Sequence, residues 1–141
     1  MRTNRSTLGR ILIALATGIV AAGAGTAQAA APVGVWIDHT GRGAVEISDC
    51  NGKLCGRIVW IESNDDQQIC GMAIIGDAKP VAPGRWDGGW ILDPEDGLRY
   101  NVELTPLGDT RLKVTGYLGT RLLSETMIWK RAPAELKRCT T

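Results

Sequence analysis

The chain has 141 residues, and its 16 basic and 15 acidic side chains leave a formal net charge of +1. The basic residues stand singly along the chain and form no patch, which argues against nucleic acid as a partner. A chain of this length supports one domain with a single hydrophobic core.

Residues 1–29 have the three parts of a cleavable signal peptide. Three arginines precede an apolar, uncharged run, 11–24, which leads to the A-x-A site Ala27-Gln28-Ala29. The run is shorter than the roughly 20 apolar residues that cross a bilayer, so we expect no membrane span once cleavage has occurred before Ala30. The sequence therefore predicts an exported bacterial protein, periplasmic or secreted, with one domain over residues 30–141.

All four cysteines lie in this domain, and an even number in an exported chain indicates disulfides. Three pairings are possible. We favour Cys50–Cys55, because Asn51-Gly52 between them is a hairpin-turn signal, and Cys70–Cys139 as the remaining pair. A zinc site with four thiolates usually has closely spaced cysteine pairs, which Cys70 and Cys139 lack. We expect no metal and no cofactor.

The domain is expected to be all-β, because its apolar residues alternate with polar ones. The clearest case is 98–104, where Leu98, Tyr100, Val102 and Leu104 share one face. The connections between strands are too short for the crossovers that parallel strands need. The expected strands are 33–38, 45–48, 54–61, 72–75, 85–92, 98–104, 111–118 and 122–131. They predict an antiparallel up-and-down meander of about eight strands, closed into a small barrel because closure removes exposed edges.

Two of the expected strands differ in how clearly their inward and outward faces are defined. In 85–92 the spacing places Trp86 and Trp90 on one face, whereas the register of 122–131 stays open because both of its faces mix apolar and polar residues. The one longer connection is 62–71, where Ser63-Asn64-Asp65-Asp66 could cap a single helical turn.

Several segments of the domain together carry a resemblance to a known family. They are Gly34-Val35-Trp36, Leu54-Cys55-Gly56-Arg57-Ile58-Val59-Trp60, Trp86-Asp87-Gly88-Gly89-Trp90-Ile91-Leu92-Asp93-Pro94-Glu95-Asp96-Gly97, Leu112-Lys113-Val114-Thr115-Gly116-Tyr117-Leu118-Gly119 and Trp129-Lys130-Arg131. In these segments the chain resembles the bacterial family called domain of unknown function 2147. The resemblance implies a lipocalin-like barrel and no particular activity.

The chain also departs from that family at two places. It has Asn64-Asp65-Asp66 where the family commonly has Asn-Pro-Asp, and Ser124-Glu125-Thr126 where the family often has Gly-Arg-Thr. No role of the family's arginine can therefore be transferred to this chain.

No catalytic constellation is found, and we expect no enzyme. His39 is the only histidine, it lies in a glycine-rich turn, and no nucleophile motif surrounds a serine. Asp93, Glu95 and Asp96 fit a hairpin turn better than a calcium loop.

The aromatic residues give the strongest functional signal, because the chain has five Trp and two Tyr but no Phe. Such side chains combine an apolar body with a polar tip. The predicted lining of a cavity inside the barrel consists of Trp60, Trp86, Trp90, Tyr100 and Tyr117. Tyr117 is the weakest candidate, since it shares its face with polar neighbours.

Trp36 is expected to have a structural role. A Gly-x-Trp on the first strand, with a cation on the last strand, is the arrangement that closes one end of lipocalin barrels, so Arg131 or Lys130 is expected to stack on Trp36. Two functions follow as alternatives. The protein binds a small apolar ligand inside the barrel, or its barrel is filled and it serves as a structural or interaction module of the cell envelope. A cavity would favour the ligand, and a filled interior with an exposed apolar patch would favour the module.

Overall fold

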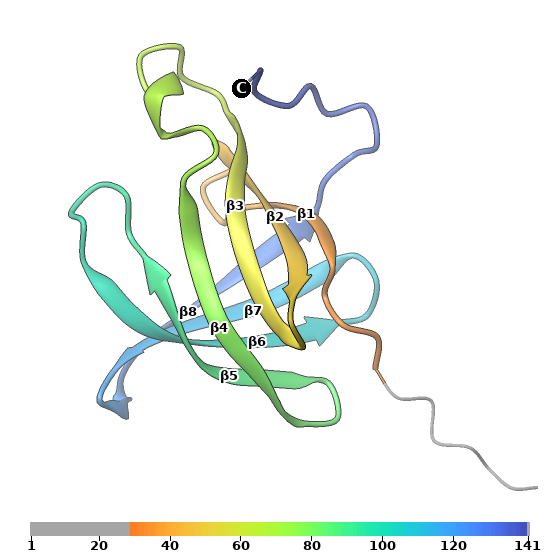
Figure 1. Ribbon diagram of the computed structural model, residues 1–141, viewed down its shortest axis with the longest axis vertical. Helices are drawn as coiled ribbons and strands as arrows, with labels where there is room; N and C mark the ends of the chain where they lie inside the picture. The colour runs from red at the N-terminus through yellow and green to blue at the C-terminus, as the bar shows by residue number, and fades with distance from the viewer. Residues whose placement is uncertain (1–28, 141) are drawn as a thin grey trace, which may run out of the picture.

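The structure is a computed structural model that describes residues 29–140, so the predicted signal peptide lies outside the described residues except for Ala29. Its eight strands form a closed antiparallel barrel in which each strand pairs with the next and β8 returns to β1 (Figure 1). The strands are β1 (Gly34–Ile37), β2 (Gly43–Cys50), β3 (Lys53–Ile61), β4 (Ala73–Ala82), β5 (Arg85–Leu92), β6 (Arg99–Leu107), β7 (Arg111–Leu118) and β8 (Thr120–Arg131). The predicted eight-strand meander is confirmed.

The only helix in the described part of the chain is one 3₁₀ turn, η1 (Gln67–Ile69), between β3 and β4. A helical turn was expected here, but the cap differs from the prediction. Asp66 occupies the N-cap position without a side-chain hydrogen bond, and the Ser63 hydroxyl instead accepts the N–H of Asp65. Within residues 29–140, no helix has the length and apolar character needed to cross a membrane.

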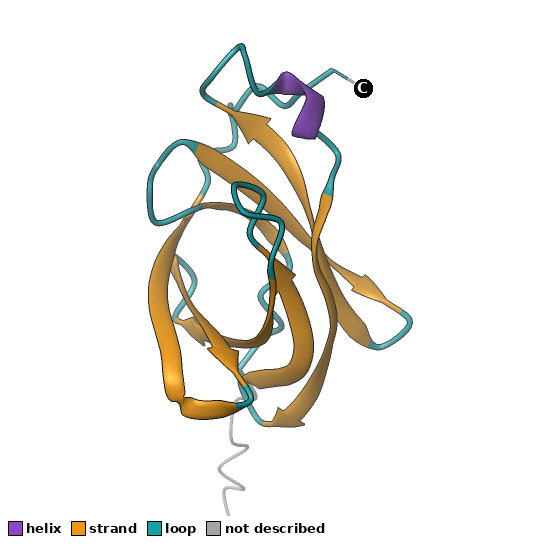
Figure 2. Ribbon diagram, turned by 90° about the vertical axis from the view of Figure 1, so that its left-hand side faces the viewer, coloured by secondary structure: helices purple, strands orange, loops and turns teal. Residues whose placement is uncertain are grey.

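The interior of the barrel is a packed core. Figure 2 shows the strands as a ring around an open centre, but side chains from every strand occupy that centre. The residues of this core are Trp36, Val45, Ile47, Leu54, Ile58, Ile74, Ile75, Ala78, Trp86, Ile91, Val102, Leu104, Leu112, Val114 and Trp129. These side chains, which come from all eight strands, occupy the space in which a guest molecule would have to lie.

Two bulges change which residues face this core. Between β2 and β3, Val45 pairs with Ile58 while Ala44 pairs with Trp60, which leaves Val59 unpaired. Between β5 and β6, the pairing jumps from Trp86 to Gly89. Each extra residue shifts the inward–outward alternation by one position from there on.

Both predicted disulfides are present. Cys50–Cys55 spans the β2–β3 turn, and Cys70–Cys139 joins the β3–β4 connection to the C-terminal segment. The segment follows the outside of the barrel, because Ala132 donates to the Val35 carbonyl and Cys139 donates to the Val59 carbonyl. Figure 1 shows its end lying beside the β3–β4 connection.

We expect loss of the Cys70–Cys139 bond to lower the free energy of unfolding by about 4 kcal/mol, because it closes a loop of 69 residues in the unfolded chain. A Cys70→Ser/Cys139→Ser protein, compared with Cys50→Ser/Cys55→Ser by denaturant unfolding, should therefore show the larger loss. Peptide mapping without reductant checks the pairing itself, and a peptide that links Cys50 or Cys55 to Cys139 would contradict it.

Candidate functional site

One end of the barrel is closed by Trp36, which is fully buried. The Arg131 guanidinium lies 3.9 Å from the centre of the Trp36 ring, and it donates to the carbonyls of Val33 and Asp109. The Trp36 indole N–H donates to the Pro32 carbonyl at 2.8 Å. Arg131 is exposed, and a guanidinium over an indole contributes about 0.5–1 kcal/mol at an exposed site. This contact therefore stabilises the closed end, and the Trp36 indole N–H has its own partner.

Gly34 makes this contact possible. Its φ of +126° disfavours any other residue, and a Cβ at this position would overlap the Arg131 guanidinium. Of the two cations expected over Trp36, the structure places Arg131 there, whereas Lys130 is exposed.

The five aromatic residues proposed as a cavity lining do not form one. Trp86 belongs to the core and Tyr100 packs against it, but Trp60, Trp90 and Tyr117 lie on the outer face of the barrel. The prediction for Trp60 and Trp90 is wrong because of the two bulges. Tyr117 follows the regular alternation of β7, in which Leu112 and Val114 face the core.

Trp90 shows what the outer tryptophans do instead. Ile91 pairs with Ile75 inside the barrel, so Trp90 lies outside and pairs with Gly76. The ring covers Gly76, where a Cβ would collide with it, and the Arg99 guanidinium lies 4.1 Å from its centre. Trp90 therefore covers the outer surface of the sheet and lines no cavity.

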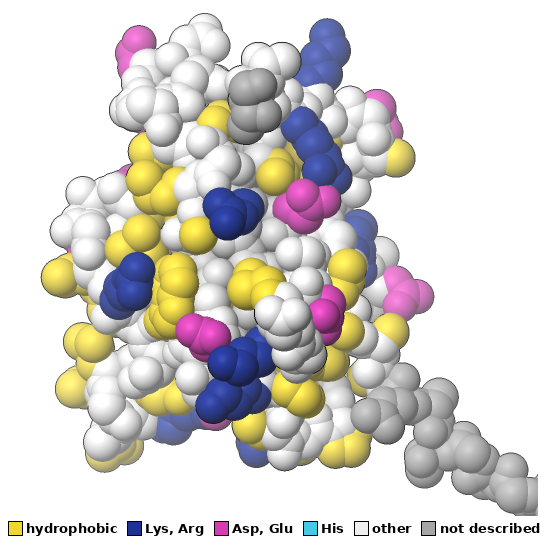
Figure 3. Space-filling model, viewed as in Figure 1, with side chains coloured by type: hydrophobic (Ala, Val, Ile, Leu, Met, Phe, Trp, Pro, Cys, Tyr) yellow, Lys and Arg dark blue, Asp and Glu magenta, His cyan; other side chains and the backbone are white. Residues whose placement is uncertain are grey.

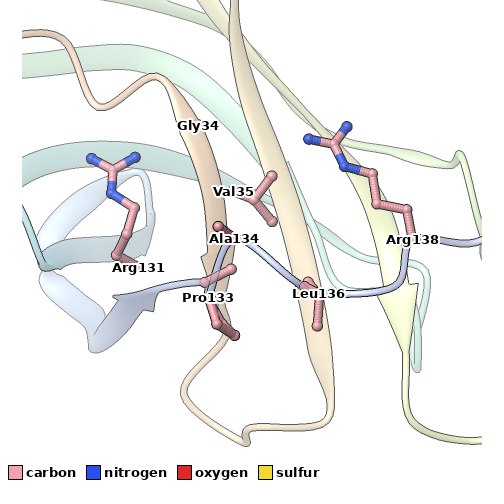
Figure 4. Close-up of a pocket in the computed structure, with 8 residues that line it drawn as sticks. Gly34, Val35, Arg131, Pro133, Ala134, Leu136 and Arg138 are labelled. Carbon is pink, nitrogen blue, oxygen red and sulfur yellow. The ribbon is translucent and has the colours of Figure 1, made fainter.

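Two hollows lie outside the barrel interior. The larger, about 320 Å³, lies between β1 and the C-terminal segment (Figure 4). Figure 4 shows Arg131 and Arg138 on opposite sides of it, with Val35 and Pro133 between them. Both arginines already have partners, because Arg131 lies on Trp36 and Arg138 pairs with Glu46 at 2.9 Å. The smaller hollow, about 120 Å³, lies at the closed end.

The opposite, open end of the barrel carries the most exposed large apolar side chains of the described residues. They are Leu122, Leu123, Leu98 and Leu118, whose exposed fractions are 93 %, 67 %, 55 % and 50 %. We call these four residues the leucine rim. Leu98 directly precedes β6, and the other three lie at the tip of the β7–β8 hairpin. Figure 3 shows hydrophobic side chains along its left-hand edge, where Figure 1 places this tip and the β5–β6 turn.

A bulge at the hairpin tip presents two of these leucines. Leu118 pairs with Thr120, but the next pair along is Tyr117 with Ser124, so residues 121–123 have no partners on β7. Leu122 and Leu123 therefore lie in a bulge outside the ladder. Arg121 directly precedes them, and its side chain lies over the outer face of the sheet.

Arg121 holds this bulge against the outer face of β5, β6 and β7. Its guanidinium forms ion pairs with Asp87 and, at 2.8 Å, with Glu103, and it lies 4.2 Å from the centre of the Tyr117 ring. The Tyr117 hydroxyl donates to Asp87 at 2.8 Å. We call these four residues the Arg121 clasp. Burial, together with the hydrogen bond to Asp87, raises the pKa of Tyr117, so its hydroxyl stays a donor at neutral pH.

Sequence reasoning missed the clasp. Glu103 is only 7 % exposed although it faces outward, and its partner lies 18 positions further along the chain. One sequence signal could have indicated the ion pair. Glu103 stands between the apolar residues Val102 and Leu104, in the strand next to the hairpin that carries Arg121. His39 is exposed in the β1–β2 turn. Within residues 29–140, no group of three or more His, Cys, Asp or Glu side chains is placed to hold a metal ion.

The sequence of the chain matches a known bacterial family. The sequence model of the family "Uncharacterized protein conserved in bacteria (DUF2147)" matches residues 34–131, which run from the start of β1 to the end of β8. The chain belongs to this family. The C-terminal segment with Cys139 lies beyond the matched residues. No curated protein matches the chain.

A solved structure gives the same fold. The protein HP1028 from Helicobacter pylori, described as belonging to the lipocalin family, superposes with a TM-score of 0.61 at 18 % identity. The match covers 74 % of this chain and 85 % of HP1028. The DUF2147 barrel of this chain is therefore lipocalin-like, as the resemblance implied.

Replacement of the Trp36 side chain by alanine tests its role in closing the barrel. We expect Trp36→Ala to lower the free energy of unfolding by about 3–5 kcal/mol, because it empties a fully buried site and removes the surface on which Arg131 lies. Trp60→Ala on the outer face is the matched control and should cost less. A Trp36→Ala protein with an unchanged melting temperature would contradict the structural role.

A double-mutant cycle tests the clasp. Arg121→Ala should destabilise the protein by about 1–3 kcal/mol, because Glu103 is left buried without its cation. Adding Glu103→Gln should recover part of this loss, with a coupling free energy above about 0.5 kcal/mol. The exposed pair Arg138–Glu46 is the control and should couple by about 0–1 kcal/mol. Strict additivity of Arg121→Ala and Glu103→Gln would show that the clasp does not hold the hairpin.

Proposed function

We propose that this DUF2147 protein is an exported interaction module, in which a filled barrel presents the leucine rim to a protein partner of the cell envelope. The observation that carries the proposal is the contrast between the two surfaces of the barrel. The inside, where a ligand would bind, is packed, and the largest apolar exposure lies outside at one end. Three of the four leucines, Leu118, Leu122 and Leu123, lie in one hairpin tip, and exposed apolar side chains gathered in this way often mark a binding surface.

The clasp supports the proposal, because it gives the rim a fixed shape. A flexible loop could partly bury Leu122 and Leu123 against the barrel, but Arg121 is tied to two carboxylates and so keeps the bulge open. Preorganisation of this kind lowers the entropy lost on binding. A leucine held 93 % exposed by three neighbouring strands is therefore well suited to insertion into a partner's pocket.

Export is the second part of the proposal. The support is the basic leader, the apolar run and the A-x-A site at residues 1–29, together with two disulfides that need an oxidising compartment to persist. Enzymatic activity forms no part of the proposal.

A second candidate function, binding of a small ligand inside the barrel, keeps one observation in its favour. Trp129 belongs to the core, and its indole N–H has no hydrogen-bond partner within residues 29–140. Buried donors normally have a partner, which is often a water molecule. A single water bound at this point would satisfy the donor, whereas an apolar ligand would have to displace several core side chains. Native mass spectrometry of protein from the periplasm separates the two functions, since the module should appear at the mass of the chain alone.

Photo-crosslinking in the native envelope tests the module. A benzophenone amino acid at position 122 should give a discrete adduct, because that side chain is held in solvent at the rim. The same probe at position 81, which is 49 % exposed at the other end of the barrel, is the matched control and should give none. The Arg121→Ala change should weaken the adduct at position 122. Equal adducts at both positions, or none at either, would overturn the proposal.

A further inference from the structure

The surroundings of the leucine rim restrict the partner that it can accept. The β5–β6 turn beside Leu98 contains Asp93, Glu95 and Asp96 and no basic residue, and Glu125 lies on β8 just after the bulge. Within residues 29–140, none of these four carboxylates forms an ion pair with a basic side chain. The apolar surface is therefore bordered by uncompensated negative charge.

Tyr100 lies close to these carboxylates at the mouth of the barrel. Burial raises the pKa of Tyr100, and the charges of Asp96, Asp93 and Glu125 raise it further. The Tyr100 hydroxyl lies 3.4 Å from Asp96 and donates toward it. The Tyr100 hydroxyl at the mouth of the barrel is thus close to carboxylates from both β8 and the β5–β6 turn.

The neighbouring cations do not offset this charge at the rim. Arg121 is held by Asp87 and Glu103, and Arg99 lies on the outer face against Trp90. The opposite end of the barrel is mixed in charge, because Asp49 and Asp109 lie there together with most of the remaining basic residues. These basic residues are Lys53, Lys79, Arg85, Arg111, Lys130 and Arg131.

We propose that the leucine rim docks into an apolar pocket of a protein whose surrounding surface is rich in lysine and arginine. This inference rests on the proposed function and names the chemistry of the partner. A lipid surface fits less well, because the bacterial headgroups available to an apolar anchor include anionic ones that repel the four carboxylates. The rim contributes apolar contact area, and the carboxylates select a basic partner and accelerate its approach.

Peptide binding tests the charge selection directly. The probe is a fluorescent amphipathic helix of leucine and lysine, and its twin carries glutamate in place of every lysine. We expect the disulfide-bonded protein to bind the lysine peptide at about 0.05 M salt and to bind it at least tenfold more weakly at about 1 M, where the screening length falls to about 3 Å. The glutamate twin should not bind at either salt concentration.

Two sets of variants separate this inference from the proposed function. Glu95→Gln/Asp96→Asn removes two charges and keeps an acceptor for the N–H of Leu98, so it should weaken binding severalfold at low salt. Asp49→Asn/Asp109→Asn removes two charges at the closed end and keeps an acceptor for the N–H of Gly52, so this variant is the matched charge control and should have no effect. Leu122→Ser/Leu123→Ser should abolish binding at both salt concentrations, while the melting temperature stays the same because both side chains are exposed.

Each outcome has a distinct meaning. If the leucine variant loses binding but the Glu95/Asp96 variant does not, the charge inference fails and the module stands. If the leucine variant binds as well as the native protein, the proposed function fails. Binding to phosphatidylcholine vesicles that contain phosphatidylglycerol, at levels above the lysine peptide, would overturn the choice of a protein partner. Self-association on gel filtration that Leu122→Ser/Leu123→Ser abolishes would assign the rim to a second copy of the chain and overturn the inference.

Discussion

Closure of the barrel depends on a small contact between the first and last strands. β1 has four residues, and only Trp36 and Ile37 pair with β8, opposite Arg131 and Lys130. Two residue pairs supply few backbone hydrogen bonds, so the side chains of the same pairs must contribute. The Arg131 guanidinium does so at three points, because it covers the Trp36 ring and binds carbonyls on either side of it. The rest of the meander has no exposed edge only because this contact exists.

The architecture was predictable because it depends on patterns that are local in the sequence. Alternation in Leu98 to Leu104, the Asn51-Gly52 turn and the spacing of the cysteines were enough for the strands, the meander and both disulfides. The closed end was predictable for a different reason, since Gly34-Val35-Trp36 and Arg131 are a motif and its partner. The register of β8 could not be predicted from the sequence. Pairing with β7 sets this register and places Trp129 in the core.

The candidate site was harder to predict, because it depends on departures from regular alternation. One extra residue at Val59 and another near Gly88 reverse the faces of Trp60 and Trp90, and neither extra residue leaves a clear mark in the local pattern. The Arg121 clasp requires three strands to be in register before its charges meet. Polar residues that face outward are normally taken as solvated, and Glu103 is not, because Arg121 covers it.

The position of the closing contact has a consequence for how the chain reaches its native state. Trp36 and Arg131 stand at the two ends of the barrel sequence, so the hairpins can form one after another but the ring cannot close until the last strand is available. Until then β1 is an unpaired edge, and contacts of such long sequence separation form slowly. A chain that emerges from the ribosome with its N-terminus first can therefore form its hairpins in turn, but the barrel closes only once the final residues of β8 are available.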